Sequence, residues 1–133
     1  MSNSQYVKGI LVQTKNPSWP WPNFTASEIA CKCGCNEVYV DPESMDALQD
    51  LRDVWGKPIV LTSAHRCTAH NAAVGGAANS RHLTLAFDCA VPAVDQDEFV
   101  ALAEGVGFTG IGTYPKRGFV HLDMGPRRRW QGK

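Results

Sequence analysis

Residues 42–55 carry apolar side chains at helical spacing. The apolar members would share one face of a helix, and they are Met45, Leu48, Leu51, Val54 and Trp55. Asp41 precedes the segment as a plausible N-cap, and Pro42 suits the first helical turn. Gly56 follows the last apolar position, and helices commonly end before a glycine. The pattern therefore predicts a helix over residues 42–55.

The other predicted elements are shorter. Helices are expected over about 25–30, 67–73 and 96–105, the last of which opens with a stretch that resembles a capping box. Strands are expected at 58–63, 85–91, 109–114 and 118–124, where apolar residues run together or alternate with polar ones. This mixed order with a late hairpin predicts an α+β fold, with an antiparallel sheet and flanking helices.

Two of the expected strands have one apolar face and one polar face. The apolar positions are Leu85, Phe87, Cys89 and Val91 in the first strand and Val120, Leu122 and Met124 in the second. Because side chains alternate across a strand, Asp88, His121 and Asp123 fall on the opposite faces. The sequence thus predicts that these polar residues face away from the core.

A candidate metal site follows from His82, which lies just before the first of these strands. His82, Asp88 and His121 supply two imidazoles and one carboxylate, which leave the fourth position of a tetrahedral zinc ion open for hydrolysis. The alternative is that both histidines are ordinary core or surface residues. Asp123 would either orient a ligand or take a proton from a bound water, or else be a surface carboxylate beside Arg127.

Length and charge set the broad class. A chain of 133 residues predicts one domain over 1–133, with an extended N-terminal arm over 1–23 and a core over 24–130. A formal net charge of zero argues against a general nucleic-acid or anionic-membrane binder, and arginines 127–129 are expected in a solvated tail. Because the N-terminus lacks the features of a signal peptide, we expect synthesis in the cytoplasm. A monomer is the default expectation.

Five cysteines leave a separate question open. Cys31, Cys33 and Cys35 form a C-x-C-x-C cluster, whereas zinc sites usually use C-x2-C pairs and need a fourth ligand. Cys67 is a possible fourth ligand and also a possible disulfide partner of one of the three. A metal site, a disulfide and free thiols packed in a loop all remain possible interpretations.

Three stretches of the chain carry a family resemblance. They are Leu61-Thr62-Ser63-Ala64-His65-Arg66, the segment from His70 to Ala77, and Ser80-Arg81-His82. With Asp88 and the tail from Gly110 to Asp123, they resemble the zinc D-Ala-D-Ala carboxypeptidase and phage endolysin family, in the branch that contains murein endopeptidases. The match runs from about Phe24 to Trp130.

The resemblance implies specific roles. His82, Asp88 and His121 would bind Zn²⁺, Arg66 would grip a substrate carboxylate or carbonyl, and Ser80 would line the same pocket. The alternatives are an ordinary salt bridge for Arg66 and a turn or cap role for Ser80. The fold implied is that of the zinc D-Ala-D-Ala peptidases, with the hedgehog-like arrangement.

The chain departs from the family pattern at three places. Asp88 comes six residues after His82, whereas the family spacing is usually seven. A spacing of seven would select Cys89 as the ligand. Because Cys89 falls on the apolar face of its strand, we favour Asp88. His65 stands where an aromatic residue usually precedes the arginine. Gly118 stands where many relatives carry an acidic base, which makes Asp123 the candidate base.

The resulting prediction is a zinc-dependent peptidoglycan peptidase that cuts amide bonds in stem peptides or cross-links. A phage-type endolysin is consistent with this prediction. Such an enzyme would be made in the host cytoplasm, released by a holin, and act at the cell wall. One alternative is a noncatalytic zinc-bearing module that binds cell-wall peptide. A second alternative takes the cysteine cluster as the only metal site of an interaction module.

Overall fold

The computed structural model describes residues 7–10, 20–35, 37–77, 79–83 and 85–133. The helical elements are α1 (Ala26–Ile29), α2 (Pro42–Trp55), α3 (Thr68–Ala73), the 3-10 turns η2 (Arg81–Leu83) and η3 (Ala93–Asp95), and α4 (Gln96–Gly105). The strands are β1 (Val7–Ile10), β2 (Glu37–Val40), β3 (Leu61–Ser63), β4 (Phe87–Ala90), β5 (Gly110–Tyr114), β6 (Phe119–Asp123) and β7 (Arg128–Gln131). Most of the expected N-terminal arm, 1–6 and 11–19, lies outside the described residues.

Five strands form the main sheet in the order β3-β4-β6-β5-β7, and β1 pairs with β2 in a separate antiparallel ladder. The pairs within the main sheet are antiparallel except β5 and β7, which are parallel. The prediction of an antiparallel sheet is therefore wrong at this edge, and the sheet is mixed. The chain reverses after β6 and runs in the direction of β5. Because β4 and β5 already flank β6, β7 pairs in parallel with the outer edge of β5.

β7 contains part of the arginine run that was expected in a solvated tail. Arg128 and Arg129 follow each other in this strand, so their side chains point to opposite faces of the sheet. Arg129 forms an ion pair with Glu104 of α4, with 2.6 Å between Nη2 and Oε2. Arg128 contacts Asp123 on the other face. Two of the three arginines thus belong to an edge strand, with one on each face of the sheet.

The two longest helices have the predicted bounds. α2 ends at Gly56, whose φ of +73° is the left-handed conformation that glycine adopts without strain. The capping chemistry differs from the prediction, because neither Asp41 nor Asp95 caps its helix through its side chain. A capping box is present instead at α1, between Thr25 and Glu28.

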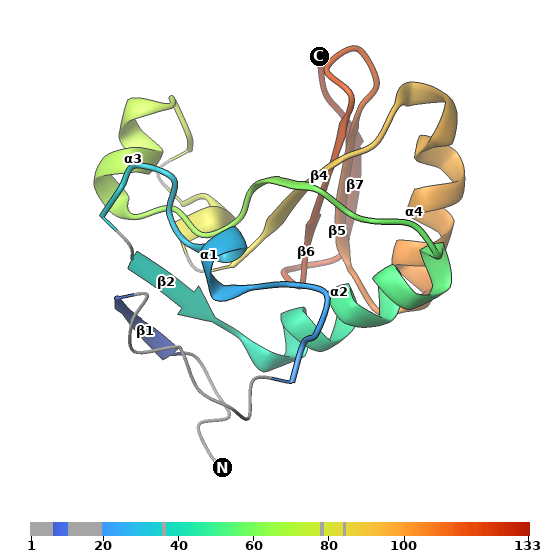
Figure 1. Ribbon diagram of the computed structural model, residues 1–133. Coiled ribbons are helices and arrows are strands. Elements are labelled where there is room, and N and C mark those ends of the chain that lie inside the picture. The colour runs from blue at the N-terminus through green and yellow to red at the C-terminus, as the bar shows by residue number, and fades with distance from the viewer. Residues whose placement is uncertain (1–6, 11–19, 36, 78, 84) are drawn as a thin grey trace.

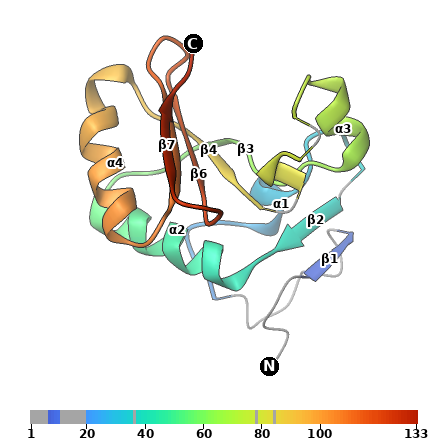
Figure 2. The same ribbon diagram turned by 180° about the vertical axis from the view of Figure 1, so that it is seen from behind.

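The main sheet separates an apolar layer from a polar one. Figures 1 and 2 show α2 and α4 together on one side of the sheet and α3 on the other. The side facing α2 and α4 carries fully buried apolar side chains, among them Phe87, Val120 and Leu122, which pack into one core with both helices. The opposite face is left for the polar residues of the strands. None of the helices in the described part of the chain is long and apolar enough to cross a membrane.

The segment before α1 is tied to α2. Trp21 is buried, and its indole N–H donates a hydrogen bond to Asp46 Oδ1 at 2.9 Å. Phe24 is also buried in the core. The chain therefore crosses α2 before it enters the loop that carries the first three cysteines.

Candidate metal centre and its cleft

One row of paired residues crosses the main sheet from edge to edge. The row is Ser63 of β3, Asp88 of β4, His121 of β6, Gly112 of β5 and Trp130 of β7. Residues paired on adjacent strands share a face and lie side by side. Strand register alone therefore brings Asp88 next to His121, and His82 joins them from η2.

The three predicted metal ligands meet at one point. Asp88 Oδ1 lies 3.3 Å from His82 Nε2 and 3.0 Å from His121 Nδ1. The three ligand atoms all lie within 4.8 Å of one another, and all three residues are buried. Two imidazole nitrogens and a carboxylate oxygen around one point form the donor set that zinc accepts while it keeps an open coordination position.

Hydrogen bonds on the far side of each ring select the nitrogen that faces this point. His82 Nδ1 donates to the carbonyl oxygen of Ala64 at 2.6 Å, because a carbonyl can only accept. His121 Nε2 lies 2.7 Å from Asp123 Oδ2. These contacts leave Nε2 of His82 and Nδ1 of His121 toward Asp88, and such outer partners fix both the orientation and the basicity of ligating histidines. The residues therefore fit a metal ion.

Interactions within the cluster keep the Asp88 carboxyl group ionised. Burial disfavours the ionised form of Asp88, but hydrogen bonds from His121 and His82 outweigh burial and hold the pKa of Asp88 well below its usual range. Burial also lowers the pKa of His121, and the hydrogen bonds to Asp123 and Asp88 outweigh it and raise that pKa above its ordinary value. Asp88 is thus held as a carboxylate, which is the form that binds a metal.

Asp123 lies behind His121, away from Asp88. Its carboxylate accepts hydrogen bonds from His121 Nε2, from both terminal nitrogens of Arg128 at 2.8 and 3.0 Å, and from the backbone N–H of Gly125. Burial raises the pKa of Asp123, but the bonds from His121, Arg128 and Gly125 prevail and lower it. Of the roles considered for Asp123, these contacts favour orientation of a ligand.

Arg66 lies beside the cluster on the segment between β3 and α3. Its Nη2 is 3.8 Å from Asp88 Oδ2, and its Nη1 donates to Asn71 Oδ1 at 3.1 Å. Asn71 is buried and also donates to the carbonyl oxygen of Ala77. A side chain at Gly76 would collide with Asn71, so this glycine leaves the space that Asn71 occupies. Arg66 is therefore held in place by Asn71.

Ser80 has a local structural contact as well as a place at the site. Its hydroxyl oxygen accepts a hydrogen bond from the backbone N–H of His82 at 3.1 Å, which caps the short η2 turn. Ser80 also lines the cleft above the cluster. Both sequence-based interpretations, a cap residue and a pocket residue, are compatible with this position.

A cleft of about 860 Å³ lies over the three ligands. Five of the six predicted site residues line it, namely Arg66, Ser80, His82, Asp88 and His121. Asp123 is not among its lining residues, which agrees with its place behind the imidazole. The cleft is large enough for a peptide segment, and its floor carries the metal-ligand cluster.

Comparisons with known proteins agree with the motifs. Residues 22–123 match the family model described as Peptidase M15. The chain belongs to the peptidase M15 family. It is 31% identical over 99 residues to the peptidoglycan L,D-endopeptidase MepK of Escherichia coli (strain K12), and equally to MepK of Shigella flexneri. The aligned part covers 68% of this chain and 54% of those proteins, so the chain spans about half the length of the curated relatives it matches. The family resemblance predicted from the motifs is confirmed.

The shortened His-to-Asp spacing of this M15 domain does not bring Cys89 to the site. Cys89 is fully buried in the core, and burial raises the pKa of its thiol. Asp88 is the residue beside the histidines. His65, at the position usually aromatic in the family, is also buried, lies 2.7 Å from Glu37 Oε2 and does not line the cleft.

Three residues of this M15 domain were missed by the sequence reasoning: Asn71, Arg128 and Trp130. The Trp130 ring lies 5.3 Å from the His121 ring between centroids, and its indole N–H donates to the Tyr114 hydroxyl. The sequence carries a signal for two of these residues. Arg128 and Trp130 alternate along one strand, and their partners on the neighbouring strand are Gly110 and Gly112, which leave room for large side chains. A side chain at Gly110 would collide with Asp123 and Arg128, and one at Gly112 with the Trp130 ring.

Proposed function

We propose that this M15 domain is a zinc-dependent peptidase that hydrolyses amide bonds in peptidoglycan peptides. The observation that carries the proposal is the convergence of His82, Asp88 and His121 on the floor of the cleft, with each ring already turned by a partner on its far side. The names of the relatives add support, since the proteins matched are peptidoglycan L,D-endopeptidases.

In this proposal, Nε2 of His82, Nδ1 of His121 and the Asp88 carboxylate hold the zinc ion. When bound, zinc polarises the scissile carbonyl and eases deprotonation of the attacking water. Arg66, whose guanidinium lines the cleft beside Asp88, binds a carboxylate or carbonyl of the substrate. Asp123 keeps the Nε2 proton of His121 in place and so presents Nδ1 to the metal.

Digestion of purified peptidoglycan tests the activity. The zinc-loaded protein is incubated with the murein, and released muropeptides are identified by mass spectrometry. We expect release that a chelator abolishes, with product masses that name the bond cut. L,D amide bonds are the first to examine, because the relatives are named L,D-endopeptidases. Murein that binds the protein without any release would instead support the noncatalytic module.

The variant His121→Ala provides the decisive comparison. It removes one of three ligands, so we expect hydrolysis below detection and loss of zinc from this site, while the fold survives because the strand hydrogen bonds remain. His70→Ala is the matched control, since His70 lies on α3 and does not line the cleft. Undiminished hydrolysis by His121→Ala would refute the assigned metal site.

A narrower proposal concerns the setting. We propose that the domain acts as a phage-type lysis enzyme at the cell wall, supported by the resemblance of its motifs to phage endolysins. Co-production with a holin in a bacterial host tests this. Lysis by the native chain with the holin, and none by His121→Ala with the holin, is expected. Absence of lysis in both would leave a wall peptidase with another role.

A further inference from the structure

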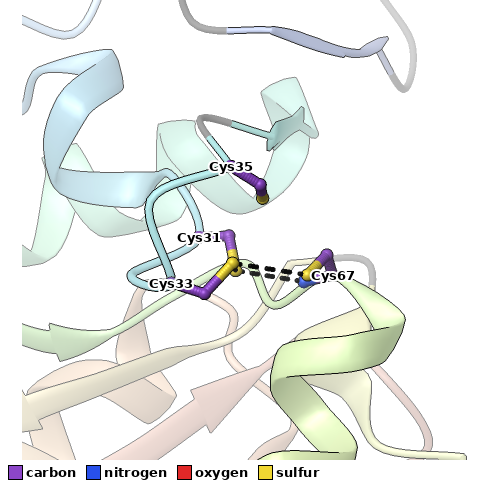
Figure 3. A group of neighbouring side chains, drawn as sticks. All are labelled: Cys31, Cys33, Cys35 and Cys67. Carbon is purple, nitrogen blue, oxygen red and sulfur yellow. Dashed lines mark hydrogen bonds between the residues drawn. The ribbon is translucent and has the colours of Figure 1, made fainter.

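Four cysteines from two distant segments converge away from the sheet. Cys31, Cys33 and Cys35 lie between α1 and β2, and Cys67 immediately precedes α3 (Figure 3). Their four sulfur atoms all lie within 4.8 Å of one another. The cluster is separate from the cleft, because none of the four residues lines it.

The sulfur separations match a metal site better than a disulfide. Cys31 Sγ lies 3.5 Å from Cys33 Sγ, which lies 3.7 Å from Cys67 Sγ. Sulfurs at the corners of a tetrahedron around zinc are about 3.8 Å apart, given a Zn–S bond of about 2.3 Å. A disulfide requires about 2.05 Å, and all five cysteines of the chain are free thiols here.

The unusual C-x-C-x-C spacing is explained by the local backbone. Residues 32–35 form a tight turn, so the three side chains do not alternate as they would on a strand. Gly34 has a φ of +96°, which allows the chain to fold back between Cys33 and Cys35. The turn is closed by a hydrogen bond from the Cys31 N–H to the Glu37 carbonyl at 2.8 Å. The turn therefore brings all three sulfurs near Cys67.

Backbone donors surround the sulfurs. The N–H of Cys67 donates to Cys31 Sγ at 3.3 Å, that of His70 to Cys67 Sγ at 3.4 Å, and that of Glu37 to Cys35 Sγ at 3.4 Å. Hydrogen bonds to sulfur favour the thiolate, which is the form that binds metal, and they orient the ligands. Three of the four sulfurs thus receive the support that structural zinc sites provide.

We propose that Cys31, Cys33, Cys35 and Cys67 bind a structural zinc ion. Four thiolates fill a tetrahedral zinc ion completely, so this second site has no open position for water or substrate and does no chemistry. Its effect is mechanical, because it links the turn before β2 to the segment that carries Arg66. The proposal stands independently of the proposed peptidase activity.

Metal content tests the site directly. The protein is purified under reducing conditions with added zinc, excess metal is removed, and zinc per chain is measured by plasma mass spectrometry. We expect two zinc ions in the wild type, one in the double variant Cys33→Ser/Cys35→Ser and one in His121→Ala. The double variant removes the two exposed thiols, so folding is least disturbed. Cys89→Ala, which removes the cysteine outside the cluster, is the matched control and keeps both ions.

Cobalt substitution separates this site from the histidine site. Thiolate-bound cobalt gives strong charge-transfer absorption in the near ultraviolet, which the histidine and carboxylate set does not give. We expect this absorption in the wild type and in His121→Ala, and its loss in Cys33→Ser/Cys35→Ser. Equal zinc and cobalt signals in that double variant and the wild type would overturn the proposal. So would an intact mass of the wild type showing disulfides at these cysteines.

Discussion

The two ligand clusters of this protein are built in opposite ways. His82, Asp88 and His121 are buried, and two of them sit opposite each other on paired strands. The cysteine cluster lies on two loops, and Cys33 and Cys35 are exposed. Strand pairing places Asp88 and His121, and a hydrogen bond to the carbonyl oxygen of Ala64 orients His82. The described parts of the cysteine loops have turn hydrogen bonds but no strand pairing across the cluster, so a bound metal ion would add a link between them.

Chelation of all metal is expected to have the largest and most unequal effect. Hydrolysis should fall below detection, while the amides of β4 and β6 keep their protection from hydrogen exchange. Amides of the turn at residues 31–35 and of the segment around Cys67 should exchange faster, because the link between them is lost. Hydrogen-exchange mass spectrometry measures both regions in one experiment. Equal loss of protection in strands and loops would contradict the contrast between the clusters.

Asp123→Asn tests how the sheet holds His121. The substitution removes the negative charge that binds Arg128 and faces His121 Nε2, so the affinity for zinc should fall about 10- to 100-fold. Competition with a chromophoric chelator measures this affinity, and turnover is then compared at saturating zinc. A catalytic base would give the reverse result, with unchanged zinc affinity and turnover lost even at saturation.

Asn71→Ala tests the contact that positions Arg66. Loss of the hydrogen bond from Arg66 Nη1 should raise KM about tenfold, the equivalent of one hydrogen bond, because Arg66 would no longer be held for the substrate. Zinc content should not change, since Asn71 touches none of the ligands. Steady-state kinetics and metal analysis together check this. A loss of kcat at unchanged KM would show that Asn71 acts in another way.

Gly112→Ala tests the close contact between β5 and Trp130, and its readout is the stability of the fold. The added methyl group would collide with the Trp130 ring, so the free energy of unfolding should fall by about 1–3 kcal/mol. Gly105→Ala is the control, because a methyl group there meets nothing within 4 Å and alanine favours a helix. Urea denaturation of both variants gives the comparison. Equal free energies of unfolding for the two variants would show that the Trp130 ring can move aside without loss of stability.

The sequence predicted the elements whose side-chain pattern is set by burial. α2 was predicted with its observed bounds, because a helix against a core must repeat its apolar positions. The bounds of α4 were also predicted, but from a capping-box-like start that the Asp95 side chain does not form. Alternation in β4 and β6 likewise placed Asp88 and His121 on one face, where the sheet pairs them. For these residues, the local side-chain periodicity and the tertiary structure require the same placement of apolar and polar side chains.

What could not be predicted depends on contacts between distant segments. The pairing of β7 with β5 follows from which sheet edge remains open, and a charged run gives no sign of that. Asn71 and Trp130 become important only through their side-chain contacts with Arg66 and His121, and no local periodicity indicates those contacts. The sequence left a four-cysteine site open as one of three interpretations, because the gathering of the sulfurs depends on a tight turn at Gly34 that alternation rules do not describe.

The parallel edge strand has a practical consequence for anyone who trims or grafts this domain. The family match ends at residue 123, yet Arg128 and Trp130 belong to the same functional unit. A fragment cut at the end of that match would retain every proposed zinc ligand but leave the Asp123 carboxylate without its arginine and His121 without its indole neighbour. The useful module therefore extends through β7, beyond the end of the family-model match.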